Sequence, residues 1–178
     1  MPGPKRSETF LEDAMRQWGD MVLCLALSHL RNTANAEDVF QDVFLRLLDS
    51  TVEFDSNEHI KGWLLRVTIN RCHDVGRSAQ RHPNEPLNET HATIEAPDLF
   101  ASDVWEAVGE LRFELRTVVH LFYVEGYSTD EIAQLVGRRP ATVRTRLHRA
   151  RTQLKHALGD GQPATENRRE PFQEGGLA

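Results

Sequence analysis

The sequence predicts an all-α protein with two small helical domains joined by a flexible acidic linker, the C-terminal domain being a helix-turn-helix. Three observations predict this fold class. Apolar residues recur at helical spacing in both halves of the chain, without the alternation typical of strands. Pro83, Pro86 and Pro97 interrupt the stretch between these halves, where a regular helix is disfavoured. Towards the C-terminus, two short helical segments are separated by a glycine turn.

These observations divide the chain into four segments. We expect residues 5–82 to form the N-terminal helical domain, residues 83–101 the linker and residues 102–158 the helix-turn-helix domain. Residues 159–178 are rich in Gly, Pro and charged residues, which predicts a disordered tail.

Charge is distributed unevenly along the chain. The 178 residues carry a net charge of −6, which by itself argues against a nucleic-acid partner. However, the stretch from Val104 to Leu158 has nine basic against six acidic side chains, whereas the stretch from Arg81 to Asp103 has one against five. Such asymmetry is typical of a nucleic-acid-binding end attached to an acidic remainder.

The composition is that of an ordinary soluble protein, with 39% hydrophobic and 27% charged residues. The longest apolar stretch, Met21–Leu27, is far shorter than the roughly 20 residues that a membrane-spanning helix needs. No signal-peptide pattern opens the chain. We therefore expect a cytoplasmic protein without membrane insertion.

No pattern of metal-ligating residues stands out, and we expect neither a metal nor another cofactor. Cys24 and Cys72 lack the spacing of a metal site, so buried free thiols in a reducing cytoplasm are expected. A metal-dependent hydrolase is one alternative, but the spacing of the histidines fits no H-E-x-x-H or related motif. The histidines considered for it are His29, His59, His73, His82 and His91.

The helix-turn-helix is predicted by local signals. Ser128 and Glu131 have the spacing of a capping box, which begins a first helix. Gly137 can adopt the left-handed conformation that ends it. Pro140 suits the first turn of a second helix, where its missing N–H costs nothing.

The second helix has an apolar stripe and a basic face. We expect it to bury Val143, Leu147, Ala150 and Leu154. The opposite face carries small and polar residues flanked by cations, namely Ala141, Thr145, His148 and Thr152 with Arg144, Arg149, Arg151 and Lys155. Arginines can read guanine edges in a major groove or hold phosphates, which favours DNA binding over a merely solvated face. Upstream, Val104–Val124 is expected to supply supporting helices.

An amphipathic helix is predicted over residues 33–50. Its inner face is apolar, with Val39, Phe40, Val43, Phe44 and Leu47. Its outer face is acidic and polar, with Glu37, Asp38, Gln41, Asp42 and Asp49. Leu45 falls within this outer arc, and an apolar residue ringed by carboxylates suggests a surface for a basic protein partner.

Another helix is predicted over about residues 58–77, preceded by a polar loop at residues 51–57. Its expected inner face comprises Ile60, Leu64, Leu65, Val67 and Ile69. The remaining arc gathers Trp63, Arg66, Asn70, His73, Asp74 and Arg77. An aromatic ring among arginines and an asparagine suits unstacked bases and phosphates, although Trp63 can equally belong to the core.

Three stretches in this order resemble the extracytoplasmic-function sigma factors, the small two-domain members of the sigma-70 family of bacterial RNA polymerase. The stretches read AEDVFQDVFLRLL, WLLRVTINRCHDVGR and STDEIAQLVGRRPATVRTRLHRARTQL. The resemblance covers roughly residues 8–158.

The resemblance implies a non-enzymatic protein that binds core RNA polymerase and promoter DNA, with an anti-sigma factor as a further partner. It implies docking on the β′ clamp through Glu37, Asp38, Gln41, Asp42 and Leu45. It implies binding of the −10 element through Phe54, Lys61, Trp63, Arg66, Asn70, His73 and Arg77. It implies binding of the −35 element through Arg138, Arg139, Thr142, Arg144, Thr145, His148, Arg149 and Arg151.

Two features depart from the family pattern. Arg112 stands where the family commonly has proline, and Arg138 with Arg139 replaces an apolar residue and a serine cap in the turn.

The alternative to a sigma factor is a free-standing helix-turn-helix regulator that binds DNA as a dimer without polymerase. Such a dimer needs paired half-sites, whereas a sigma factor needs an asymmetric two-element promoter.

Overall fold

A computed structural model describes residues 6–81 and 102–159 of the chain. Both described parts are helical, which confirms the predicted fold class. The predicted linker and nearly all of the predicted tail lie outside the described residues. Three helices form the N-terminal half: α1 (Glu8–Leu30), α2 (Thr33–Asp49) and α3 (Asn57–Arg81). The C-terminal half consists of α4 (Asp103–Glu110), α5 (Phe113–Val119), η2 (His120–Val124), α6 (Thr129–Val136) and α7 (Pro140–Leu158).

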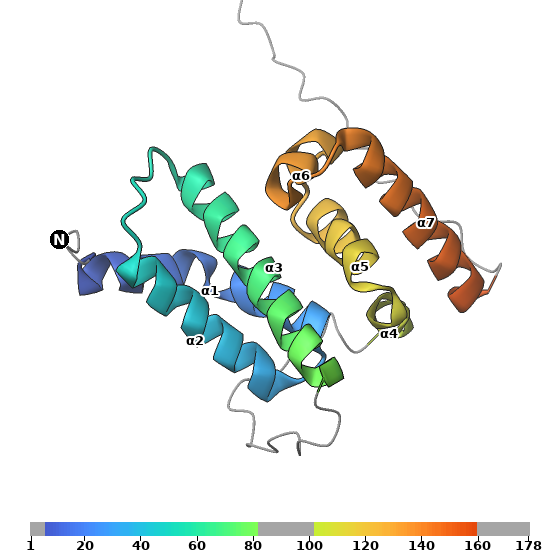
Figure 1. The fold of residues 1–178 in the computed structure, drawn as a ribbon, viewed down its shortest axis with the longest axis horizontal. Helices are drawn as coiled ribbons and strands as arrows, with labels where there is room; N and C mark the ends of the chain where they lie inside the picture. The colour runs from blue at the N-terminus through green and yellow to red at the C-terminus, as the bar shows by residue number, and fades with distance from the viewer. Residues whose placement is uncertain (1–5, 82–101, 160–178) are drawn as a thin grey trace, which may run out of the picture.

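The N-terminal half is a three-helix bundle in which α1 packs against both α2 and α3 (Figure 1). Side-chain caps begin its first two helices: Ser7 Oγ accepts from the backbone N–H of Phe10, and Asn32 Oδ1 accepts from that of Asn35. The predicted inner face of α2 is confirmed, because Val39, Val43, Phe44 and Leu47 are buried and Phe40 is half-buried. On α3, Ile60, Leu64 and Leu65 are buried as expected, whereas Val67 and Ile69 are half-buried.

The local signals of the helix-turn-helix are confirmed. Ser128 Oγ accepts from Glu131 N–H, and the Glu131 carboxylate accepts from Ser128 N–H at 2.8 Å, which completes the capping box. Gly137 ends α6 with φ of 63°, a left-handed conformation that favours glycine. Pro140 begins α7, and no side chain caps this end because Arg139 stands at the N-cap.

Helix α5 continues into η2, one turn of π-helix that the sequence did not reveal. The Glu125 N–H bonds to the carbonyl of His120, five residues back. His120 and Leu121, the first two residues of η2, are both fully buried. The predicted supporting segment is otherwise confirmed: its apolar residues Val108, Leu111, Leu115, Val118 and Val119 are buried, with Trp105 and Phe122 half-buried.

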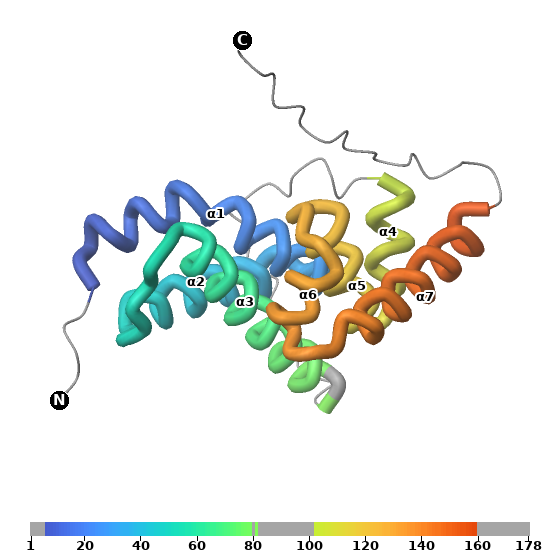
Figure 2. Tube along the Cα trace, turned by 90° about the horizontal axis from the view of Figure 1, so that it is seen from above, coloured from blue at the N-terminus to red at the C-terminus, as the bar shows by residue number. Residues whose placement is uncertain are grey.

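The two halves pack directly against each other. Leu25 of α1 and Leu65 of α3 are fully buried in one hydrophobic cluster with residues of the C-terminal half. Its C-terminal members are Val118, Leu121, Ile132, Ala133, Val143 and Leu147. Consequently α3 lies beside α6, as both views show (Figure 1, Figure 2). The sequence predicted Leu65 as an inner residue, but not that its neighbours come from the helix-turn-helix.

Candidate nucleic-acid interface

The outer face of α7 is arranged as the sequence predicts. Arg144, Thr145, His148 and Arg149 are exposed, while Val143, Leu147 and Ala150 on the opposite side are buried. Leu154, also expected to be buried, is half-buried near the end of the helix. The Thr145 hydroxyl donates to the Ala141 carbonyl at 2.9 Å, a common bond of threonine within a helix. The exposed arginines and histidine therefore form a continuous polar and basic helix face that a major groove can accept.

Arg151 is held against the C-terminal half. Its Nε donates to the Tyr123 hydroxyl at 2.7 Å, and its guanidinium lies 5.5 Å from the centroid of the Phe122 ring. These contacts hold the Arg151 side chain next to η2.

The turn between α6 and α7 adds cations to this face. Arg138 and Arg139 are exposed and line one hollow together with Thr142, which is half-buried. Asp130 of α6 also lines this hollow. At the start of α7, Pro140 has no N–H, and the N–H groups of Thr142 and Val143 bond to the Arg139 carbonyl, so the two arginine side chains are the charged donors that the hollow offers. The predicted −35 residues thus form one continuous surface on α7 and its preceding turn.

The predicted −10 residues of α3 and the loop before it divide into two groups. Arg66, Asn70 and Arg77 are exposed. Phe54, Lys61, Trp63 and His73 are half-buried, each in contact with other parts of the chain. The rings of Phe54 and Trp63 lie 5.9 Å apart, and Trp63 packs against the N-terminal core. Trp63 therefore has both a core side and an accessible side.

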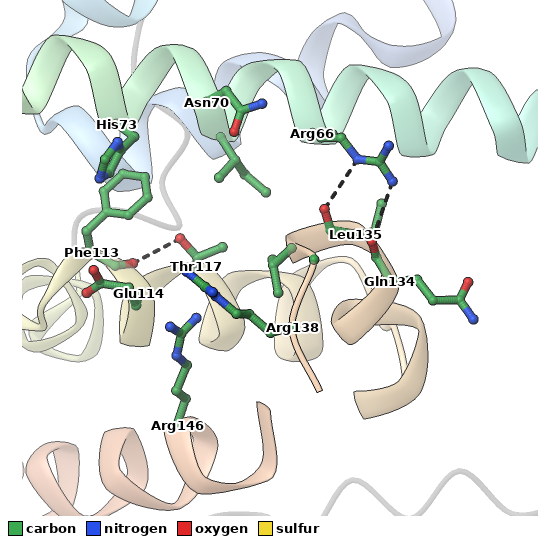
Figure 3. Close-up of a pocket in the computed structure, with 13 residues that line it drawn as sticks. Arg66, Asn70, His73, Phe113, Glu114, Thr117, Gln134, Leu135, Arg138 and Arg146 are labelled. Carbon is green, nitrogen blue, oxygen red and sulfur yellow. Dashed lines mark hydrogen bonds between the residues drawn. The ribbon is translucent and has the colours of Figure 1, made fainter. Parts of the chain in front are cut away.

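A cavity of about 490 Å³ lies beside the α3–α6 contact and is lined by α3, α5 and the helix-turn-helix (Figure 3). Arg66, Asn70 and His73 line it from α3, whereas Arg138 and Arg146 line it from the turn and α7. Arg66 crosses to α6, its Nε donating to the Leu135 carbonyl at 3.3 Å and its Nη2 to that of Gln134 at 3.5 Å. The predicted −10 and −35 surfaces therefore meet at one cavity.

The outer face of α2 is exposed at its centre. Leu45 is 57% exposed, more than any other large hydrophobic residue in the described part of the chain. Asp38 and Gln41 beside it are exposed, and Glu37 is half-buried. The Asp42 carboxylate pairs with Arg46 at 2.9 Å and with Arg71 of α3, so part of the acidic face is neutralised within the protein. Helix α2 lies on the opposite side of the molecule from α7 (Figure 1).

A buried histidine joins the two halves, a role that no local sequence pattern indicates because its partner is 88 residues away. His29 of α1 places Nε2 2.8 Å from the Thr117 hydroxyl of α5, and Nδ1 3.1 Å from the Leu25 carbonyl. Burial, with smaller contributions from His120 and Arg116, lowers the pKa of His29 to about 3. His29 is therefore neutral in the folded protein at physiological pH.

This lowered pKa predicts a loss of stability in mild acid. An unfolded histidine binds a proton near pH 6.5, whereas folded His29 does not until about pH 3. The unfolded state is thus favoured as the pH falls through 6.5, by about 1.4 kcal/mol between pH 7.5 and 5.5. Urea unfolding at both pH values measures this loss. In the His29→Gln variant, position 29 cannot bind a proton, so the free energy of unfolding should fall by about 1.4 kcal/mol less between these two pH values. An equal fall in the variant and the wild type would contradict the prediction.

The two cysteines are free, as expected. Cys72 is buried, and burial raises its pKa to about 12, so it is a protonated thiol. Cys24 is half-buried, and burial together with Asp20 raises its pKa.

Within residues 6–81 and 102–159, no group of three or more His, Cys, Asp or Glu side chains is placed to hold a metal ion. His82 and His91 lie outside the described residues. None of the helices described here is long and apolar enough to cross a membrane.

Comparisons with known proteins match both halves of the chain. A family model described as Sigma-70 region 2 matches residues 14–82, and one described as Sigma-70, region 4 matches residues 102–154. The chain is 32% identical over 157 residues to ECF RNA polymerase sigma factor SigE of Mycolicibacterium smegmatis, covering 83% of this chain but only 61% of SigE. It is 33% identical over 156 residues to RNA polymerase sigma factor CarQ of Myxococcus xanthus, covering 84% and 89% of the two chains.

A solved structure shares the fold. Sigma factor RpoE of Bartonella quintana, in complex with the anti-sigma factor NepR, superposes with a TM-score of 0.63 at 23% identity, over 85% of this chain and 98% of that chain. A match on both halves disfavours a free-standing helix-turn-helix regulator, which would account for residues 102–154 alone. With both regions present in order and CarQ aligned over most of both chains, this chain belongs to the extracytoplasmic-function group of the sigma-70 family of RNA polymerase sigma factors.

Proposed function

We propose that this chain docks on core RNA polymerase through α2 and positions α3 and α7 on the two elements of a promoter. The observation that carries the proposal is the presence of both sigma-70 regions, at residues 14–82 and 102–154, in one chain. The protein performs no catalysis itself and acts in the cytoplasm, where it directs the polymerase to a start site and helps open the duplex there.

The polymerase contact is assigned to the outer face of α2, with Glu37, Asp38, Gln41, Asp42 and Leu45. An apolar side chain that is 57% exposed and surrounded by carboxylates fits an interface with an apolar centre and a charged rim. The partner surface is then basic, as the resemblance implies for the β′ clamp. Because α2 lies opposite α7, this contact leaves the recognition helix accessible to DNA (Figure 1).

The −35 contact is assigned to α7 and its preceding turn. Arg144, Thr145 and His148 are exposed in the middle of the basic face and are proposed to read base edges. Arg149 and Arg151 are proposed to contact phosphates, as are Arg138 and Arg139 in the turn. These phosphate contacts position α7 on the duplex without contributing base specificity.

The −10 contact is assigned to α3 and the loop before it. Arg66, Asn70 and Arg77 offer donors to phosphates and bases, and the accessible side of Trp63 offers a stacking surface. Phe54, Lys61 and His73 complete the proposed set. Binding of unstacked bases offsets the few kcal/mol required to extrude a base from the duplex, which favours strand opening.

An anti-sigma factor is proposed as a further partner. RpoE of Bartonella quintana, whose fold this chain shares, is in complex with the anti-sigma factor NepR. We propose that a protein of that class binds this chain and withholds it from the polymerase.

In vitro transcription tests the proposal. Core RNA polymerase and the purified chain are combined on a DNA fragment carrying the region upstream of the chain's own gene, and specific initiation that requires the chain is expected. The Leu45→Lys variant should bind core polymerase at least about tenfold more weakly, because it places a cation where a basic partner is expected. Co-elution with core polymerase measures this binding.

The matched control is Met15→Lys. Met15 of α1 is also an exposed large hydrophobic residue, at 39%, but lies outside the proposed surface. This variant should bind core polymerase as the wild type does. If Leu45→Lys also binds normally, α2 is not the docking surface. If the wild-type chain neither co-elutes with core polymerase nor supports initiation, the proposed function itself is wrong.

A further inference from the structure

Two arginine side chains point into one cavity without a partner among the described residues. Arg138 of the turn before α7 and Arg146 of α7 extend toward the same space beside Thr117 of α5 (Figure 3). In the part of the chain that the structure describes, neither side chain forms a hydrogen bond or an ion pair. Two guanidinium groups that converge in a partly shielded space repel each other, and an anion between them removes this repulsion. The pair therefore points to an anionic ligand.

Arg146 is the one arginine of α7 that the proposed promoter contact leaves unassigned. It is half-buried, and it lies roughly 200° around the helix from Arg144, which is exposed on the outer face. Arg146 lines the cavity between α7, α5 and α3 instead of the outer face. The DNA contact proposed for the outer face of α7 therefore does not use this guanidinium.

The charges that line the cavity favour an anion. Arg66 is the third arginine of the lining, but its guanidinium already donates to the carbonyls of Gln134 and Leu135. Glu114 is the one carboxylate of the lining and is half-buried. The cavity thus has an excess of positive charge, although the whole chain carries a net charge of −6. Attraction of an anion to this chain is consequently local to the cavity.

The size and the remaining lining of the cavity indicate what kind of anion fits. Its volume of about 490 Å³ is within the range of small-molecule sites, roughly 300–1,000 Å³, and excludes a nucleic-acid duplex. The rings of His73 and Phe113 line it with their centroids 5.0 Å apart. The Asn70 amide lines it too, and an amide can both donate to and accept from a base edge. The cavity therefore combines cations with aromatic rings on which a base can stack.

We propose that this cavity binds a free nucleoside diphosphate or triphosphate. Arg138 and Arg146 hold the phosphates, and the base packs against the rings of Phe113 and His73. Asn70, His73 and Arg138 also belong to the proposed DNA surfaces, so a bound nucleotide competes with the promoter for these side chains. That competition rests on the proposed function, whereas nucleotide binding itself does not.

Isothermal titration calorimetry on the free full-length chain tests the site, with ADP, GDP and inorganic pyrophosphate as the probes. We expect at least one of the two nucleotides to bind at least about tenfold more tightly than pyrophosphate, because pyrophosphate lacks a base to stack. Absence of binding by both nucleotides overturns the proposal. Pyrophosphate binding as tightly as both nucleotides also overturns it, because the aromatic rings would then contribute nothing.

Variants then locate the bound nucleotide. Arg146→Ala should raise the Kd of the nucleotide at least about tenfold, because it removes a charged donor to the phosphates. The matched control is Arg112→Ala, which removes the same charge from an exposed position at the start of α5 that does not line the cavity. This control should bind the nucleotide as the wild type does. An unchanged Kd for Arg146→Ala, or an equal rise for Arg112→Ala, overturns the site.

A variant with the opposite expected effect separates binding from damage to the fold. Glu114→Gln removes the carboxylate of the lining and keeps its size, so the Kd of the nucleotide should fall by about threefold or more. Tighter binding cannot arise from a misfolded chain. A Kd that rises or stays unchanged in Glu114→Gln contradicts a phosphate site in this cavity.

Discussion

The Leu147→Ala variant is expected to lower the free energy of unfolding by about 2–5 kcal/mol. Leu147 of α7 is 2% exposed and lies in the hydrophobic cluster that the two halves share. Truncation to alanine removes buried methyl groups and leaves a cavity bordered by α5 and α6 that the surrounding helices fill only in part. Urea unfolding followed by circular dichroism at 222 nm measures the change.

The matched control for this variant is Leu158→Ala. Leu158 ends the same helix but is 43% exposed, so its truncation should change the free energy of unfolding by no more than about 0.5 kcal/mol. Equal effects at both positions would show that α7 is not held in place by its buried stripe. The recognition face would then lack the rigid support that base readout requires.

The Arg144→Ala variant is expected to weaken binding to a cognate −35 element by about 1–3 kcal/mol, provided that Arg144 pairs with a guanine. This loss corresponds to a fold-change in Kd between about five and more than one hundred. Arg144 is exposed on the outer face of α7, and bidentate pairing with guanine O6 and N7 is the arginine contact that discriminates most strongly among bases. Fluorescence anisotropy with cognate and scrambled −35 duplexes measures the change.

Arg149→Ala provides the contrast within the same helix. A phosphate contact should weaken binding to both duplexes about equally and reduce the salt slope by about 1, without changing the preference for the cognate duplex. Arg144→Ala should instead reduce the ratio between the Kd for the scrambled duplex and the Kd for the cognate duplex. Should the wild-type chain bind cognate and scrambled duplexes equally, the assignment of Arg144 as a base-reading residue is wrong.

Features set by short sequence separations could be predicted without the structure. Ser128 and Glu131 stand three residues apart and form their capping box regardless of what α6 packs against. Gly137 at the helix end and Pro140 at the next helix start act in the same local way. Helical periodicity also identified the buried stripe of α7 and the exposed position of Leu45 on α2. Both depend only on 3.6 residues per turn.

The tertiary structure alone decided which buried faces meet. Periodicity marks Leu65 as an inner residue, but it carries no information on whether the covering residues come from α1 or from α6. Arg66 and Leu135 are 69 residues apart, and His29 and Thr117 are 88 apart, so no local pattern relates them. By itself, then, the sequence determined the helices, their caps and their polar faces, because these follow from interactions within one or two turns. The contact of α3 with α6, the buried neutral His29 and the Arg66 hydrogen bonds to α6 arise from packing between the halves, which only the folded chain defines.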